Sequence, residues 1–155
     1  MSATHQGLST SELGRFLIRG VLGVVFVGHG AQKLFGIFGG PGLTGFSGFL
    51  DGLGIPFPMV NAVLAGSAEF FGGLALLAGV GTRVSAALLV STMVVATFAV
   101  QSRGLSVQNG GMEYPLVLAV LLTGIGLLGP GHLTLASLLR PVPAKTHGLV
   151  KTDPA

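Results

Sequence analysis

The sequence predicts an all-helical membrane protein: a bundle of four transmembrane helices with a short amphipathic helix in the first outer loop. Half of the 155 residues are hydrophobic and only 8% are charged, whereas charged residues make up about 25% of an average soluble domain. The mean hydropathy is +0.81. Four apolar stretches approach or exceed the length that crosses the roughly 30 Å hydrocarbon core of a bilayer. The lipid bilayer is therefore the first expected partner of the chain.

The first expected span covers residues 13–35, and it carries Arg15 and Arg19 ahead of its apolar run. That order of charge and apolarity is also typical of a signal peptide. A signal peptide ends at a small-x-small cleavage site, but residues 28–33 of this span read GHGAQK and are polar where small residues would be needed. We therefore expect the span to be retained as a transmembrane helix.

The first outer loop has a helical pattern of its own. Residues 39–42 read GGPG, which is typical of a turn because glycine adopts positive φ and proline restricts its neighbour. Apolar residues then recur at positions 43, 46, 49, 50 and 53. This spacing predicts a short amphipathic helix over 43–53, lying in the membrane interface or folded over the bundle. The formal match to G-x-G-x-x-G at positions 40–45 follows no strand, so dinucleotide binding is rejected.

The remaining spans are expected at residues 59–79, 84–101 and 114–128. The second contains Glu69 near its centre, where an ionisable side chain costs about 2.5–3.5 kcal/mol on insertion scales and is usually functional or paired. Small residues repeat at four-residue spacing around it, as at Ala65 and Gly73. Such repeats let membrane helices approach closely, so Glu69 should face a helix interface.

The charge distribution predicts the orientation and the domain limits. With four crossings, six of the eight Lys and Arg residues fall on the face that holds both termini, and the other two fall on the opposite face. By the positive-inside rule both termini are cytoplasmic, in a bacterial inner (cytoplasmic) membrane. Residues 13–139 form the membrane domain, and the polar segments 1–12 and 140–155 are expected to be disordered tails.

Polar side chains converge on the outer half of this bundle. His29 and Lys33 are four residues apart and share a helix face. At a rise of 1.5 Å per residue, His29 lies about 9 Å and Glu69 roughly 16 Å below the outer surface. We predict that these two approach within one hydrogen bond or one bridging water, with Lys33 and Gln32 at the rim of the same cavity and Glu113 at its mouth. The candidate ligand-binding residues are His29, Gln32, Lys33, Glu69, Glu113 and Tyr114.

Each candidate also has a structural interpretation. His29 is equally suited to donate to a backbone carbonyl, and Lys33 to extend toward the outer headgroups. Glu69 is equally suited to neutralise one of them and hold two helices together. Glu113 suits a helix N-terminus, where the dipole favours a negative charge, and Tyr114 suits an interfacial anchor.

Several classes of site are excluded by composition. The chain has no cysteine, so it cannot form a disulfide, a thiolate metal site or an iron–sulfur cluster by itself. It has no C-x-x-C-H motif for covalent haem, and His29 and His132 lie at opposite faces of the expected bundle. No residue set has enough ligands for a metal site. The net charge is +3, but no basic stripe predicts nucleic-acid binding.

Four sequence blocks occur in a characteristic order: residues 19–36, 39–56, 68–83 and 109–116, followed by the Gly-Pro-Gly turn at 129–131. No single block is specific, but the ordered set is. In these blocks the chain resembles the DoxX family of small bacterial membrane proteins. One departure follows that turn, where members often read Ser-Leu-Asp and this chain reads Thr134-Leu135-Ala136.

The resemblance implies a four-helix inner-membrane fold and a subunit linked to quinone reduction or redox defence. The sulfur chemistry of some family members is not expected in this chain, because it has no cysteine to carry sulfur. Quinone binding, which other members show, is more compatible with this sequence. A quinone needs hydrogen-bond donors in an apolar cleft, and His29, Gln32 and Lys33 are side chains of that type. We therefore expect a redox-associated subunit with no intrinsic cofactor, with quinone as a ligand, and with a redox partner protein or a homo-oligomer as its assembly. The alternatives are a non-catalytic scaffold that anchors a partner, and a small transporter or proton pathway.

Overall fold

The computed structural model describes residues 9–139, and every regular element in that range is helical. The helices are α1 (Thr10–Phe35), α2 (Gly42–Gly52), α3 (Pro58–Ala78), α4 (Thr82–Val100), α5 (Glu113–Leu128) and α6 (Leu135–Leu138). Two single-turn 3-10 helices, Gln101–Arg103 and Val107–Asn109, connect α4 to α5. The predicted tail segments 1–8 and 140–155 lie outside the described residues.

Within residues 9–139, three helices are long and apolar enough to cross a membrane: α1, α3, and α4 with its extension to Arg103. The fourth expected span, α5, is apolar but has only 16 residues, which at 1.5 Å per residue is about 24 Å. The all-helical class is thus confirmed for the described residues. The fourth crossing and the interfacial position of α2 stay predictions.

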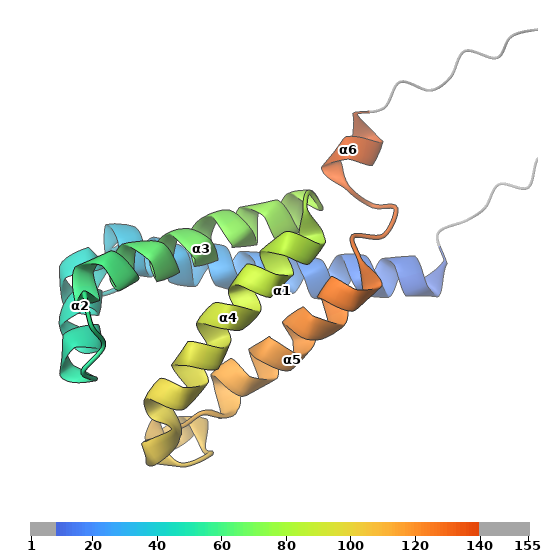
Figure 1. The fold of residues 1–155 in the computed structure, drawn as a ribbon. Coiled ribbons are helices and arrows are strands. Elements are labelled where there is room, and N and C mark those ends of the chain that lie inside the picture. The colour runs from blue at the N-terminus through green and yellow to red at the C-terminus, as the bar shows by residue number, and fades with distance from the viewer. Residues whose placement is uncertain (1–8, 140–155) are drawn as a thin grey trace, which may run out of the picture.

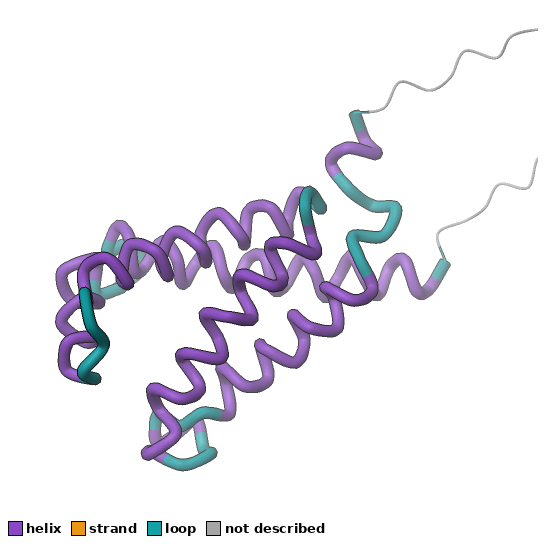
Figure 2. The backbone as a smooth tube through the Cα atoms, in the orientation of Figure 1, coloured by secondary structure: helices purple, strands orange, loops and turns teal. Residues whose placement is uncertain are grey.

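The helices form two antiparallel pairs (Figure 1). In one pair α3 packs along α1, and in the other α5 packs along α4. The pairs converge toward the α3–α4 turn and diverge toward α2, which lies across the far end of the first pair (Figure 1). Figure 2 shows that the loops are confined to the helix ends. The fully buried apolar core joins the two pairs and includes Leu22, Phe26, Leu76, Leu89 and Leu122.

The helix ends follow from local sequence. Ser9 accepts a hydrogen bond from the backbone N–H of Glu12 and caps α1, so α1 begins at Thr10, three residues before the expected span. α1 ends at Gly36, whose left-handed φ of 69° is accessible to glycine without strain. Pro58 occupies the first turn of α3, where a missing N–H costs nothing. The helix predicted over 43–53 forms as α2, one residue earlier.

Glycines bring α1 and α3 into backbone contact. A Cβ added at Gly30 would overlap the backbone of Phe70, and one added at Gly73 would lie 2.7 Å from the N atom of Val27. Neither neighbour is a flexible side-chain end that could move aside. The small-residue spacing of the sequence therefore serves close helix packing, as predicted.

Arg19 is buried in the middle of α1, with 1% of its surface exposed. Its guanidinium donates to the carbonyls of Leu76 and Leu77, at the end of α3, and to the carbonyl of Leu133, beyond α5. The last carbonyls of a helix lack intrahelical partners, so the guanidinium caps α3 and ties the C-terminal segment to it. From its place in the sequence Arg19 was expected only to contribute to the charge bias of the cytoplasmic face; its hydrogen bonds show that it also holds helix ends together.

Replacing Arg19 with lysine is expected to lower the free energy of unfolding by about 1 kcal/mol. The planar guanidinium of Arg19 donates to α3 and to Leu133 at the same time, and the single ammonium group of lysine cannot reach both. Thermal unfolding in detergent micelles measures the change. Arg15→Lys is the control, since Arg15 is partly exposed and its guanidinium pairs with Glu12 at 3.2 Å, within the same helix. Equal loss in both variants would contradict the structural contribution of Arg19.

Candidate functional site

A partly buried ion pair joins the last turn of α1 to the middle of α3. Lys33, in the last turn of α1, places its Nζ 2.5 Å and 2.6 Å from the two carboxylate oxygens of Glu69, in the middle of α3. Glu69 is 1% exposed and the Lys33 side chain 22%. The ammonium also lies 4.8 Å from the centroid of the Phe46 ring on α2, within cation–π range. One charged group thus connects α1, α2 and α3.

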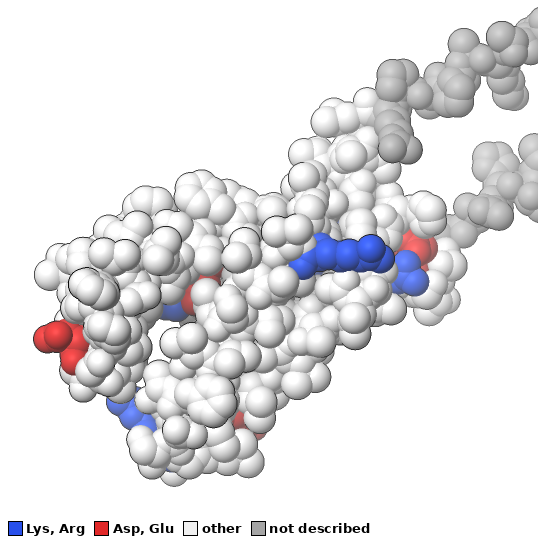
Figure 3. Space-filling view, viewed as in Figure 1, with Lys and Arg blue, Asp and Glu red and all other residues white. Residues whose placement is uncertain are grey.

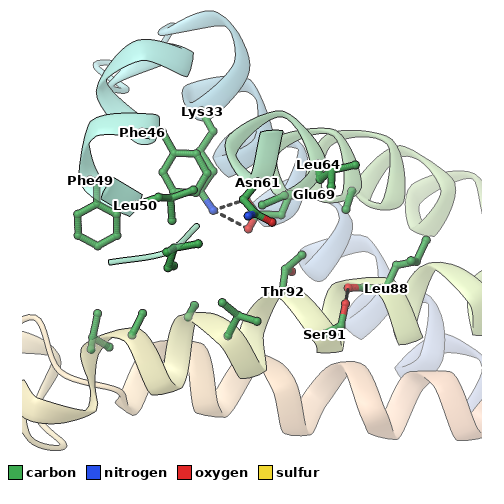
Figure 4. A pocket seen from close by; sticks show the side chains of 17 residues that line it. Lys33, Phe46, Phe49, Leu50, Asn61, Leu64, Glu69, Leu88, Ser91 and Thr92 are labelled. Atoms are coloured by element: carbon green, nitrogen blue, oxygen red, sulfur yellow. Dashed lines mark hydrogen bonds and ion pairs between the residues drawn. The ribbon is translucent and has the colours of Figure 1, made fainter. Parts of the chain in front are cut away.

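The ion pair closes one end of an apolar cavity of about 510 Å³. This volume is within the usual range for small-molecule sites. Figure 4 shows Lys33 reaching Glu69, with α2 side chains on one side and α4 on the other. The wall is supplied by α2 through Phe46, Phe49 and Leu50, by α3 through Leu64, Ala65 and Ala68, and by α4 through Leu88, Val95, Ala96 and Ala99, with Ile55 and Val100 at its margin.

Three uncharged polar residues also line the cavity. Ser91 and Thr92 lie next to each other on α4, and Asn61 lies on the first turn of α3. Together with the ion pair they give a mainly apolar chamber a few polar groups, which is the usual composition of a site for an apolar ligand with a polar head.

The cavity reaches the outside of the helix bundle between α3 and α4. Leu64, Leu88 and Val95 line it, and the same residues are 61%, 51% and 56% exposed. The space-filling view shows a hollow between the helix pairs with blue and red atoms inside (Figure 3). If α3 and α4 cross a bilayer, this opening faces lipid.

His29 and Tyr114 form a second polar contact. The Nε2 atom of His29 is 3.0 Å from the Tyr114 hydroxyl, and the rings meet edge to face with centroids 5.8 Å apart. This contact joins α1 to α5. Both residues line a smaller cavity of about 240 Å³ together with Gln32 and Phe38. The Gln32 side-chain amide donates to the Phe38 carbonyl at 3.2 Å.

The structure divides the six predicted site residues among three places. Among the described residues no direct hydrogen bond joins His29 to Glu69, and the other predicted form of this contact, through one bridging water, stays a prediction. The four-carbon stem of Lys33 carries a full charge to the carboxylate, and the imidazole of His29 pairs with Tyr114 instead. Glu113 opens α5, is exposed, and accepts from the backbone N–H of Val107 at 3.2 Å.

Among the residues of the larger cavity that had not been predicted as site residues are its three uncharged polar groups, Asn61, Ser91 and Thr92, and the aromatic Phe46. Phe46 was recognised only as part of the amphipathic pattern. Ser91 and Thr92 carry a signal that could have found them, because they are adjacent hydroxyls near the middle of an apolar span. For Asn61 the sequence offers no comparable signal.

The fold and this site define a small helical membrane protein with a buried ionic group at the end of an apolar chamber. The family model named DoxX matches residues 14–102, which run from α1 through the turn after α4. The chain belongs to the DoxX family.

A curated relative carries the name "Putative oxidoreductase CatD" and comes from Bacillus subtilis (strain 168). It is 30% identical over 107 residues, which cover 69% of this chain and 74% of the relative. No solved structure matches the chain.

Proposed function

We propose that this protein is a redox-associated integral membrane subunit that binds a quinone or a similar lipid-soluble ligand in the 510 Å³ cavity. The observation that carries the proposal is the cavity itself: an apolar chamber that opens between two apolar helices and has the Lys33–Glu69 pair inside. Membership of the DoxX family and the name of the relative support the redox association.

The chemistry of the chamber suits a ring with a polar edge and an apolar tail. The ring would lie among Phe46, Leu50 and Ala96, with one oxygen directed at Lys33. The tail would leave between Leu64 and Leu88 into the lipid. An ammonium stabilises negative charge that develops on a carbonyl during reduction, and a neighbouring carboxyl group can exchange the proton that reduction requires.

Electrons would come from a partner protein. The chain has no cysteine and no motif for covalent haem or for a dinucleotide, so we assign it no intrinsic cofactor. The exposed apolar surface of the bundle leaves room for that partner or for a second copy of the chain.

The same proposal includes the topology. α1, α3, α4 and the shorter α5 would cross the bacterial inner membrane, with both termini in the cytoplasm and α2 at the outer surface. Six of eight Lys and Arg residues then lie on the cytoplasmic side. In this orientation the cavity opens to the outer leaflet, where a lipid-soluble ligand can enter without crossing water.

The test is calorimetric titration of the full chain in lipid nanodiscs with decylubiquinone, with empty nanodiscs subtracted. The natural sequence should bind, and Glu69→Gln should weaken binding about tenfold, which corresponds to about 1.4 kcal/mol. The control is Glu113→Gln, the same chemical change at an exposed position that lines neither cavity. Its affinity should match that of the natural sequence.

The scaffold alternative makes the opposite forecast. The natural sequence would then not bind the probe, and a partner protein that copurifies with the chain would stay bound to the Glu69→Gln variant. Either a failure of the natural sequence to bind, or equal affinities of the Glu69 and Glu113 variants, would contradict ligand binding at this cavity.

A further inference from the structure

The hydroxyl groups of Ser91 and Thr92, which line the cavity, both donate hydrogen bonds to backbone carbonyls of α4. Ser91 Oγ donates to the carbonyl of Leu88 at 2.6 Å, and Thr92 Oγ1 donates to the carbonyl of Leu89 at 2.9 Å. A hydroxyl has one proton to donate and two lone pairs that accept. With their protons directed back to the helix, Ser91 and Thr92 offer acceptors to whatever fills the chamber.

The Lys33–Glu69 pair also leaves few hydrogen-bond donors free for a ligand. An ammonium has three N–H donors, and two contacts of Lys33 go to the oxygens of Glu69. The Phe46 ring covers a further part of the ammonium. An ionised Glu69 can only accept. The Asn61 amide donates to the Pro56 carbonyl at 2.7 Å, which leaves one N–H and the amide oxygen.

Acceptors therefore outnumber free donors around the cavity. A quinone presents two carbonyl oxygens, which also only accept, so it could use the remaining donor of Lys33 but would face the lone pairs of Thr92 and Ser91 without a hydrogen bond. A quinol presents two O–H groups, each of which can donate and accept. It satisfies the acceptors and can still accept from Lys33.

From this balance, and resting on the proposed function, we propose that the cavity selects the reduced, hydroxyl-bearing form of its ligand, a lipid-soluble quinol, over the quinone. Thr92 is the residue that sets the preference. Figure 4 shows it on α4 with its side chain directed toward Glu69 on α3, so that acceptors from two helices border the space where the polar head would be. Ser91, one residue earlier, adds to the effect.

Selective binding of one oxidation state changes the redox chemistry of the bound couple. A ligand form that binds more tightly is stabilised, so a preference for quinol raises the reduction potential of the bound couple relative to the free one. A tenfold preference corresponds to about 30 mV for a two-electron couple. A quinone reduced at this site would thus be reduced more easily than in the lipid pool.

The experiment compares decylubiquinol with decylubiquinone, under anaerobic conditions, by calorimetric titration of the full chain in nanodiscs. The natural sequence should bind the quinol about five- to tenfold more tightly, the factor contributed by one hydrogen bond. Thr92→Val replaces the hydroxyl with a methyl group of similar shape, and it should bring the two affinities together by weakening quinol binding. Thr92→Ser keeps the acceptor and should keep the preference.

The matched control is Thr97→Val. Thr97 lies on the same helix, donates in the same way to the carbonyl of Met93 at 2.7 Å, and does not line the cavity. Its variant should preserve the preference. Equal affinities for the two forms in the natural sequence, or tighter quinone binding, would overturn selection while leaving the proposed function intact. Equal effects of Thr92→Val and Thr97→Val would overturn the assignment to Thr92, and no binding of either probe would overturn both proposals.

Discussion

Replacing Lys33 with methionine is expected to destabilise the protein by about 3–5 kcal/mol, the cost of leaving one member of a buried ion pair without its partner. The substitution leaves the Glu69 carboxylate alone at 1% exposure. Glu69→Gln should cost less, because the ammonium it leaves behind belongs to a side chain that is 22% exposed and can still donate to the new amide oxygen. The structure thus predicts an asymmetry between the two halves of one contact.

Equilibrium unfolding of the two single variants and of the double variant Lys33→Met/Glu69→Gln measures this asymmetry. Because the double variant buries no unpaired charge, it should regain much of the stability lost in Lys33→Met. Simple addition of the two single effects would show that the side chains do not interact. That result would contradict the ion pair.

Replacing Gly30 with alanine is expected to be the second most damaging of the changes considered, at about 1–3 kcal/mol for overpacking. The added Cβ would meet backbone atoms of Phe70, which can yield only if α1 and α3 move apart. Lys33 lies one turn after Gly30, and Glu69 immediately precedes Phe70. Probe binding should therefore weaken along with stability.

Gly28→Ala provides the comparison within the same helix. A Cβ at Gly28 meets nothing within 4 Å, and alanine is favoured over glycine in helices by up to about 1 kcal/mol. Thermal unfolding of both variants should therefore shift in opposite directions. A destabilised Gly28→Ala, or an unaffected Gly30→Ala, would contradict the close approach at Phe70.

Periodicity and composition were sufficient to predict α1 to α5, but not the short helix α6 or the two 3-10 helices. The expected spans agree with α3, α4 and α5 within two residues at each end, and the pattern at 43–53 agrees with α2. The burial of Glu69 was also predictable, since a charge in the middle of an apolar helix must avoid lipid. These features depend on local sequence and on the cost of transferring a charge.

The partners within the site were not predictable from sequence alone. Depth estimates favoured His29 as the neighbour of Glu69, but the reach of Lys33 and the rotation of α1 decide the pairing. The same rotation directs His29 to Tyr114. Arg19 was misread for a related reason: its charge suggested a solvent-facing flank, whereas its position on the face of Leu22 and Phe26, three and seven residues later, directs it inward.

The contact between Arg19 and Leu133 joins positions that are 114 residues apart in the chain. At synthesis rates of about 5–20 residues per second, a ribosome needs roughly 6–23 s to make the intervening segment. α1 and α3 can pair during that interval, with the guanidinium held by the carbonyls of Leu76 and Leu77 alone. The hydrogen bond from Arg19 to the Leu133 carbonyl can form only when the chain beyond α5 has been synthesised. A nascent protein can therefore pair α1 with α3, which carry Lys33 and Glu69, before the segment after α5 is bound to them.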